Sequence, residues 1–323
     1  MLNKFLFPAP KPPNYTLESH KHNLFWLPTD STNESSSIPC MFYSPEYSNR
    51  EIEYFMIFCH GNGCDIGSMH YTLSEFSRHL NVYAISFEYP TYGLCTASSP
   101  NQETINNHAE QAFNFVSNTL NWPIERIIIY GHSIGSGAAC YLASMHSIGA
   151  LILQSPYTAI NSLVREKAGV LSYLIRTRSW DNLEVMKHIQ CPVLFIHGLD
   201  DTLIPPNHSQ ILYDACLNLE RKKIILLRNE DHNSITEATL LRYITPFIEK
   251  QCKPMNTDIH LPVIKIDKQL RESPENLTSK DVDNSAGGIL TSLYSISRAS
   301  TAATSSVLRK MASKDQNQSD EDE

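Results

Sequence analysis

The sequence predicts an α/β fold in which a mostly parallel sheet is covered by helices on both faces. From Glu53 onward, short apolar runs alternate with amphipathic stretches, and strands of a parallel sheet that is buried on both faces have such uninterrupted apolar runs. Strand and helix patterns alternate along the chain, which is typical of βαβ units. The chain has 323 residues, of which 41% are hydrophobic, so it can bury one large core.

Six apolar runs are predicted to be the parallel strands, with helices in the gaps between them. They are Tyr54–Cys59, Val82–Phe87, Arg126–Gly131, Ala150–Ser155, Pro192–His197 and Lys223–Arg228. Before them, Leu24–Ser44 has the pattern of two strands around a polar turn, which predicts an antiparallel edge on the sheet. The longest interval between strands, Tyr157–Gln190, is mostly helical in pattern and could form a small cap. Its apolar positions are Ile160, Leu163, Val164, Leu171, Leu174 and Ile175.

The chain divides into three parts by composition. Residues 1–22 form an N-terminal segment, residues 23–252 the α/β domain, and residues 253–323 a tail rich in Ser, Thr, Asn, Lys and Asp that closes on SDEDE. The tail is too poor in large apolar residues to fold alone, so we expect it to be disordered. Gly288–Met311 could form a helix on a partner, but disorder is the simpler expectation.

Charge and cysteine content exclude several classes of function. The formal net charge of −8 and the absence of a dense Lys/Arg block give no field that attracts a phosphate backbone, so nucleic acid is not an expected partner. The eight cysteines are scattered singly, which is typical of reduced thiols in a reducing compartment. No CxxC or HExxH motif occurs, and neither a metal nor a cofactor is expected.

The N-terminus lacks a secretory signal, and no segment approaches about 18 uninterrupted apolar residues. The predicted location is the cytoplasm, with peripheral contact to the cytoplasmic face of a membrane as an option. Four apolar residues could make that contact, although covering the edge of the domain is the simpler interpretation for them. They are Leu2, Phe5, Leu6 and Phe7.

The most informative motif is Gly131-His132-Ser133-Ile134-Gly135, a GxSxG sequence between a predicted strand and an Ala-rich helix. A nucleophile on so sharp a strand-to-helix turn needs small neighbours, and the turn exposes the hydroxyl in a strained conformation. This context predicts that Ser133 is a catalytic nucleophile. GxSxG alone is weak evidence because Gly and Ser are common in loops, so partners are needed.

A serine hydroxyl needs a histidine base and an acid that orients it, and in this fold they follow in the order Ser, acid, His. Asp201 follows the strand that begins at Val193, and we favour it as the acid because the turn reads HGxxD; the adjacent Asp200 is the competitor. His232 lies in a polar loop after the last strand and is the predicted base.

The tetrahedral oxyanion needs two backbone N–H donors already in place. The turn FCHGNGCDIG after the first core strand has small residues that permit such an approach. We assign the donors to Asn62 and Ile134, with Gly63 as the alternative for the first, because the sequence does not settle which amide points inward.

The same glycines support a competing interpretation. FCHGNGCDIG contains GxGxxxG after a strand, and the next strand ends in Glu88, so the pattern is close to a dinucleotide fingerprint with its ribose-binding acid. A bound nucleotide would make the protein an oxidoreductase or a sensor. That interpretation leaves Ser133, Asp201 and His232 unexplained. A third class, a non-catalytic member that binds a partner through the same fold, is less favoured because the triad is complete.

With these residues in view, the chain resembles the α/β-hydrolase superfamily and, within it, the α/β-hydrolase domain-containing protein 17 family of depalmitoylases. The motifs occur in that family's order over roughly Phe5 to Lys250. They are IPCMFYSP, FCHGNGCDIGSM, FEYPTYG, ERIIIYGHSIGSGAA, LQSPYTA, CPVLFIHGLDD and DHNSI.

The resemblance implies a serine hydrolase that cleaves acyl esters or thioesters, with palmitoyl-cysteine on membrane-associated proteins as the leading substrate. It also implies that Ser133, Asp201 and His232 are the triad. The chain departs from the family because it has no cysteine before Cys40, whereas family members have an acylated N-terminal cysteine cluster. The alternative is a soluble carboxylesterase or serine peptidase of the same fold, because a triad does not distinguish thioester, ester and amide. Apolar residues near the crevice, Tyr92, Leu94, Tyr157 and Ile160 among them, are candidates for acyl contact, although buried residues of this kind usually form core.

Overall fold

A computed structural model describes residues 6–28, 37–45, 50–97, 99–163, 180–217, 220–252 and 259–274. These residues form one eight-stranded sheet of order β1-β2-β4-β3-β5-β6-β7-β8. β1 pairs antiparallel with β2, β2 pairs antiparallel with β4, and every later pair is parallel. The strands are β1 Leu24–Pro28, β2 Ser37–Tyr43, β3 Tyr54–Cys59, β4 Val82–Phe87, β5 Ile127–His132, β6 Ala150–Gln154, β7 Val193–Gly198 and β8 Lys222–Leu227.

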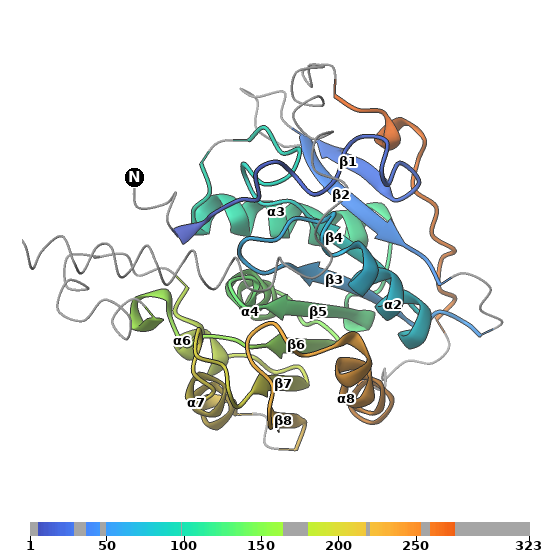
Figure 1. Ribbon diagram of the computed structural model, residues 1–323. Coiled ribbons are helices and arrows are strands. Elements are labelled where there is room, and N and C mark those ends of the chain that lie inside the picture. The colour runs from blue at the N-terminus through green and yellow to red at the C-terminus, as the bar shows by residue number, and fades with distance from the viewer. Residues whose placement is uncertain are drawn as a thin grey trace, which may run out of the picture.

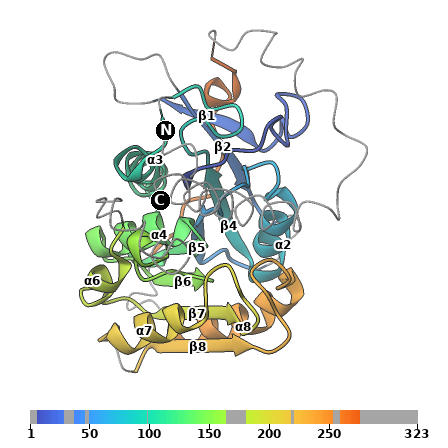
Figure 2. The same ribbon diagram turned by 60° about the vertical axis from the view of Figure 1, so that its left-hand side comes forward.

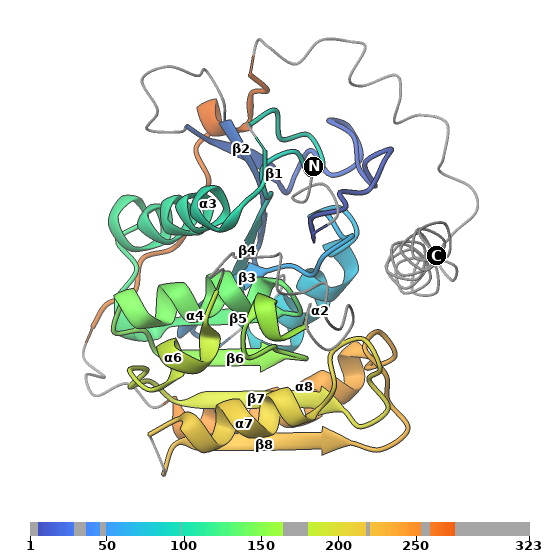
Figure 3. The same ribbon diagram turned by 90° about the vertical axis from the view of Figure 1, so that its left-hand side faces the viewer.

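Helices cover both faces of this sheet (Figure 1). Figure 2 shows α2 and α8 on one face, and Figure 3 looks onto α3, α4, α6 and α7 on the other. The helices are α2 His70–Leu80, α3 Gln102–Asn114, α4 Gly135–Met145, α6 Asn182–Met186, α7 Asn207–Ala215 and α8 Glu237–Gln251, with shorter turns at Phe115–Thr119, Ile124–Arg126 and Gln269–Arg271. The predicted α/β class, the antiparallel edge and the six parallel strands are confirmed, with strand ends shifted by at most one residue.

The central strands are apolar on both faces because each face has its own core. In β3, Phe55 and Ile57 belong to the cluster under α3 and α4, whereas Met56 and Phe58 belong to the cluster under α2 and α8. Successive strand side chains point to opposite faces, so a strand between two helical layers must be apolar at every position. This explains the unbroken run YFMIFC.

The packed part of the chain extends past Cys252, where the domain boundary was predicted. Leu261, Ile264 and Ile266 are buried in the core cluster, and the amide of Ile264 donates to the hydroxyl of Tyr83 at 3.3 Å. Composition missed this segment because a few apolar residues suffice when a hydrophobic surface already exists to receive them. The remainder of the predicted tail, including Gly288–Met311, lies outside the described residues.

The predicted cap is described only at its two ends. Ala159 and Asp181 form an isolated antiparallel bridge that brings these ends together, and α6 follows directly. Val164, Leu171, Leu174 and Ile175 lie outside the described residues. No helix within the described ranges is long and apolar enough to cross a membrane.

Candidate active site

Ser133 lies at a sharp turn between β5 and α4. Its backbone has φ +54°, in the left-handed region that costs an L-residue about 1–2 kcal/mol. Its amide donates to the carbonyl of Gln154 on the neighbouring strand at 2.9 Å, which holds the turn in place. The sharp strand-to-helix turn predicted from GxSxG is therefore present in the backbone.

Glycines around this turn allow close approach of backbone to backbone. A Cβ on Gly135 would lie 2.2 Å from the carbonyl oxygen of Cys59, and a Cβ on Gly131 would lie 2.6 Å from the Cβ of Ala139. No real Cβ tolerates such contacts, so glycine at these positions is what lets α4 start directly against β3 and β5. The start of α4 and the end of β3 thus share one edge of the sheet.

The structure brings the three predicted triad side chains together. Nε2 of His232 lies 2.9 Å from Oγ of Ser133, and Nδ1 of His232 lies 2.7 Å from Oδ2 of Asp201. All three side chains are buried, with residue exposures of 7%, 5% and 3% for Ser133, His232 and Asp201. The neighbouring Asp200 is exposed, so Asp201 is the aspartate at the site.

His232 reaches the site because its loop folds back over the end of β7. A Cβ on Gly198 would lie 2.2 Å from the carbonyl oxygen of Glu230, so this glycine permits the approach. The amide of Asp200 donates to the same carbonyl at 2.9 Å. Within the loop, the carboxylate of Asp231 accepts from the amides of Asn233 and Ser234, which fixes the turn that carries His232.

The carboxylate of Asp201 accepts four hydrogen bonds. Oδ1 accepts from the amides of Leu203 and Ile204 at 2.9 and 2.8 Å, while Oδ2 accepts from His232 and faces Nε2 of His197 at 3.1 Å. Burial acts to raise the pKa of this carboxyl, but hydrogen bonds from His197 and His232 outweigh it and hold the pKa well below its usual range. Asp201 is therefore ionised whenever the protein is folded at neutral pH.

His197 is the residue at this site whose contact with the acid sequence reasoning missed. Its Nδ1 lies 2.6 Å from Oγ of Ser209, and its Nε2 faces both Oδ2 of Asp201 and the carbonyl oxygen of Ile204, at 3.1 and 2.8 Å. Because both partners of Nε2 are acceptors, the proton belongs on Nε2 and Ser209 donates to Nδ1. The available sequence signal was that His197 ends a strand directly before the glycine turn that leads to Asp201.

His132 packs beside the base without joining the triad. Its ring stacks on His232 with centroids 5.5 Å apart, and burial, followed by the nearby His232, lowers its pKa to about 3. His132 is neutral at ordinary pH and therefore adds no second positive charge when His232 is protonated. The imidazolium form of His232 is therefore not destabilised by a positive charge on His132.

The two predicted oxyanion donors follow the ends of two adjacent strands, Asn62 in the loop after β3 and Ile134 at the start of α4. Cys59 of β3 pairs with Gly131 of β5, so Asn62 and Ile134 each follow three residues after this paired position at the same edge of the sheet. In the part of the chain that the structure describes, neither amide donates to a protein acceptor. Free amides at the edge of the sheet that carries Ser133 are what the predicted oxyanion hole needs, and the amide of Gly63, the alternative first donor, likewise donates to no protein acceptor among the described residues.

The dinucleotide interpretation fails on the surroundings of Glu88. The side chain is fully buried, with Oε1 accepting from the amide of Ile66 at 3.0 Å and Oε2 lying 3.6 Å from Nε2 of His60. A Cβ on Gly67 would lie 2.5 Å from the Cβ of Tyr15, so this aromatic side chain fills the space over the turn. Burial raises the pKa of Glu88, and its carboxyl has no path to a ribose.

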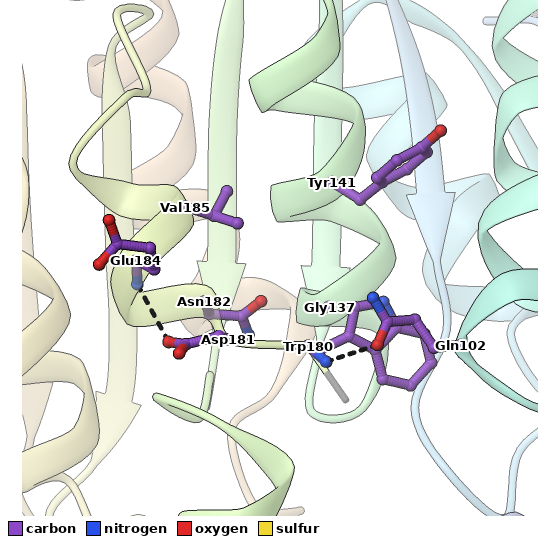
Figure 4. Close-up of a pocket in the computed structure, with 8 residues that line it drawn as sticks. All are labelled: Gln102, Gly137, Tyr141, Trp180, Asp181, Asn182, Glu184 and Val185. Atoms are coloured by element: carbon purple, nitrogen blue, oxygen red, sulfur yellow. Dashed lines mark hydrogen bonds between the residues drawn. The ribbon is translucent and has the colours of Figure 1, made fainter. Parts of the chain in front are cut away.

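The residues considered for acyl contact are core residues. Tyr92, Leu94, Tyr157 and Ile160 are all buried, as the simpler expectation for such residues predicted. A separate hollow of about 360 Å³ lies between α3, α4 and α6 (Figure 4) and contains none of the triad residues. It is lined by Gln102, Gly137, Tyr141, Trp180, Asp181, Asn182, Glu184 and Val185.

Comparisons with known proteins find similarity to serine hydrolases and to α/β hydrolases. Residues 90–233 match the family described as serine hydrolase (FSH1), a range that contains Ser133, Asp201 and His232. The α/β hydrolase L404 of Acanthamoeba polyphaga mimivirus is 28% identical over 77% of this chain and 92% of its own length. Human α/β hydrolase domain-containing protein 17B is 28% identical over 57% of this chain, and the match spans only 62% of that protein's length.

The solved structures resemble this one in fold. The esterase Pf2001 of Pyrococcus furiosus superposes with a TM-score of 0.59 at 15% sequence identity, covering 76% of this chain and 99% of the esterase. At that identity the likeness concerns the fold alone. Eight mostly parallel strands, the covering helices and this likeness together confirm the α/β-hydrolase fold.

Proposed function

We propose that this chain, a serine hydrolase with the α/β-hydrolase fold, is an S-acyl protein thioesterase that uses Ser133, His232 and Asp201. Its resemblance to α/β hydrolase domain-containing protein 17B supports this choice of activity. The observation that carries the serine-hydrolase chemistry of this proposal is the unbroken series of contacts from Oγ of Ser133 through His232 to Asp201, at 2.9 and 2.7 Å. Distances of this size are those at which a general base accepts a proton from its nucleophile.

In the acylation step, Oγ of Ser133 attacks the acyl carbonyl carbon while its proton passes to Nε2 of His232. The carbonyl π electrons move to the oxygen, which becomes the oxyanion and accepts hydrogen bonds from the amides of Asn62 and Ile134. The C–S bond then breaks, and the departing sulfur takes the proton from His232. The products are acyl-Ser133 and a free cysteine thiol.

In deacylation, water attacks the acyl-serine carbonyl and gives its proton to His232. The C–Oγ bond breaks, Oγ recovers the proton, and a fatty acid leaves. Asp201 remains a carboxylate throughout and stabilises the imidazolium that forms in each half-reaction. Its low pKa supports this role because a carboxyl that stays ionised offers a fixed negative charge.

A thioester is the substrate class that we favour, because the sequence motifs resemble those of the α/β-hydrolase domain-containing protein 17 family, whose members are depalmitoylases. The partner would be an acylated protein presented at the cytoplasmic face of a membrane, and the eight described cysteines, all free, are compatible with a reducing cytoplasm. A thiolate is a good leaving group, so thioester cleavage depends less on protonation by His232 than amide cleavage does.

The proposal is tested with a fluorophosphonate probe and a substrate series. We expect the probe to label wild type and not Ser133→Ala, and hydrolysis by Ser133→Ala to fall by about 10⁴-fold or more. Long-chain S-acyl substrates should be cleaved with higher kcat/KM than short p-nitrophenyl esters. A preference for short soluble esters, together with no flotation on anionic vesicles, would favour the soluble carboxylesterase instead. If the probe does not label Ser133 in folded wild-type protein, the proposal of serine-hydrolase activity is wrong.

A further inference from the structure

The two amides of the oxyanion hole come from separate elements, the loop after β3 and the start of α4. Two residues near the N-terminus, Leu6 and Phe7, contact both elements or their direct supports. Resting on the function proposed above, we propose that Leu6 and Phe7 are positioning residues that hold the oxyanion hole in shape. Figure 1 shows this dark-blue start of the described chain on the side to which the arrow of β5 points, where the nucleophile turn also lies.

The first contact fixes the loop after β3. Nδ2 of Asn62 donates to the carbonyl oxygen of Leu6 at 2.7 Å, and the hydroxyl of Tyr92 donates to Oδ1 of Asn62 at 2.6 Å. The side chain of Asn62 is thus held at both ends, by the N-terminal segment on one side and the loop after β4 on the other. Because its side chain is fixed, the Asn62 backbone, and with it the amide that faces the oxyanion, loses rotational freedom.

The second contact supports the start of α4. The buried ring of Phe7 packs edge-on against Trp180, with centroids 6.1 Å apart and an interplanar angle of 74°. Trp180 in turn lies against Gly137, where a Cβ would come within 2.5 Å of the indole Cγ. The amide of Gly137 donates to the carbonyl of Ile134 at 3.1 Å, so the indole packs on the turn that carries the second oxyanion donor.

Trp180 is a firm support because α3 holds it. Its amide donates to Oε1 of Gln102 at 2.8 Å, and its Nε1 donates to Oδ1 of Asn106 at 2.9 Å. Figure 4 shows the indole beside Gly137, with the bond from Trp180 to Gln102 drawn as a dashed line. Phe7 therefore packs on a fixed surface, and Leu6, its neighbour in the chain, cannot move independently of it.

An oxyanion hole is sensitive to this kind of support. Its donors act on charge that exists only in the transition state, and one donor is worth about 3 kcal/mol of barrier, or somewhat over 100-fold in rate. Loss of the Leu6 carbonyl would leave Nδ2 of Asn62 without its acceptor and free the loop to turn. We therefore expect kcat to fall while KM stays nearly constant, because substrate binding does not use the developed oxyanion.

The test compares two deletions in the full chain on a short soluble ester, so that membrane contact has no influence. One deletion removes residues 2–7, and the matched control removes residues 2–5 and keeps Leu6 and Phe7. We expect the longer deletion to lower kcat at least tenfold per active site titrated with fluorophosphonate, with KM changed less than about twofold. The affinity for a boronic acid, whose tetrahedral adduct places an oxygen in the hole, should weaken by a similar factor. The control deletion should match wild type in all three values.

A purely structural role would lower the melting temperature of the longer deletion and leave kcat per titrated site and boronate affinity at wild-type values; that result would overturn the inference. Equal loss of kcat in both deletions would also overturn it. If the longer deletion does not fold, Tyr92→Phe provides the second test. Removing the hydroxyl that holds the side chain of Asn62 should lower kcat and boronate affinity together. Unchanged values would contradict the inference that a fixed Asn62 side chain keeps the oxyanion hole in shape. Failure of the proposed function itself is distinguishable, because wild type would then show no labelling or hydrolysis.

Discussion

At the scale of the residue, the left-handed backbone of Ser133 predicts that nucleophilicity and stability oppose each other at this position. Glycine adopts φ +54° without the penalty that an L-residue incurs, whereas alanine retains it. We expect Ser133→Gly to unfold with a free energy about 1 kcal/mol greater than that of Ser133→Ala, with both variants inactive. Urea unfolding of the two variants measures this difference, and the comparison is matched because both lack the hydroxyl. Equal stabilities would mean that the turn carries no strain.

His197 is the residue through which the environment of the acid can be tested. In His197→Phe the donor to Oδ2 of Asp201 and to the carbonyl of Ile204 is lost. A hydrogen bond to a charged group contributes about 1.5–3 kcal/mol, so kcat/KM should fall at least tenfold at pH 7. His188→Phe, which changes an exposed histidine, is the control and should retain wild-type activity. His197→Gln, which can still donate, should recover part of the loss, and no loss in His197→Phe would exclude a role for this residue.

The same variant has a predicted pH dependence of stability. Since the folded-state pKa of Asp201 is lowered, the ionised carboxylate stabilises wild type above the ordinary pKa of about 3.9, and this contribution is lost as pH falls through the folded-state pKa. His197→Phe should raise the pKa of this carboxyl. Because the unfolded state of Asp201 is the same in both proteins, the part of their difference in unfolding free energy that this carboxyl causes should be largest at neutral pH and should shrink as pH falls through the higher folded-state pKa of the variant. A difference that grows as the pH is lowered would contradict this account.

At the scale of the element, the position of α4 depends on the absence of one methyl group. A Cβ at Gly135 would lie 2.2 Å from the backbone oxygen of Cys59, which cannot move aside without breaking the pairing of β3 with β5. Gly135→Ala should therefore lower the melting temperature by several degrees and reduce kcat, because the start of the helix carries the amide of Ile134. Ser144→Ala, at an exposed site on the same helix, should change neither quantity. Thermal unfolding and ester kinetics on the two variants check this.

At the scale of the whole molecule, residues 259–274 pack on the domain across the antiparallel edge. Leu261, Ile264 and Ile266 are buried there, and Arg271 donates to the carbonyl of His22. Burial of an aliphatic side chain contributes about 1.5–3 kcal/mol before the cost of ordering the chain. A chain that ends at Cys252 should therefore unfold with a free energy at least about 2 kcal/mol lower than one that ends at Pro274. Equal urea midpoints and slopes for the two chains would show that the segment adds nothing to the stability of the domain.

The local pattern was sufficient for the class of fold and for the order of the triad. Alternation of apolar runs with helical stretches places strands and helices without reference to distant residues, and GxSxG, HGxxD and the late histidine are each local signals. Asp201 could also be preferred to Asp200 because a turn of fixed length after a strand points one carboxylate back toward the edge of the sheet.

Only the tertiary structure decided the contacts between segments that lie far apart in the chain. The meeting of His197 with Asp201 depends on how a turn closes, the burial of Ile264 on a surface that already exists, and the contact of Leu6 with Asn62 on the path of the N-terminal segment across the domain. Propensity and periodicity report only neighbours along the chain. In the sequence, Asn62 is indistinguishable from an ordinary loop residue. Only the folded structure shows that its side chain is hydrogen-bonded to both Leu6 and Tyr92.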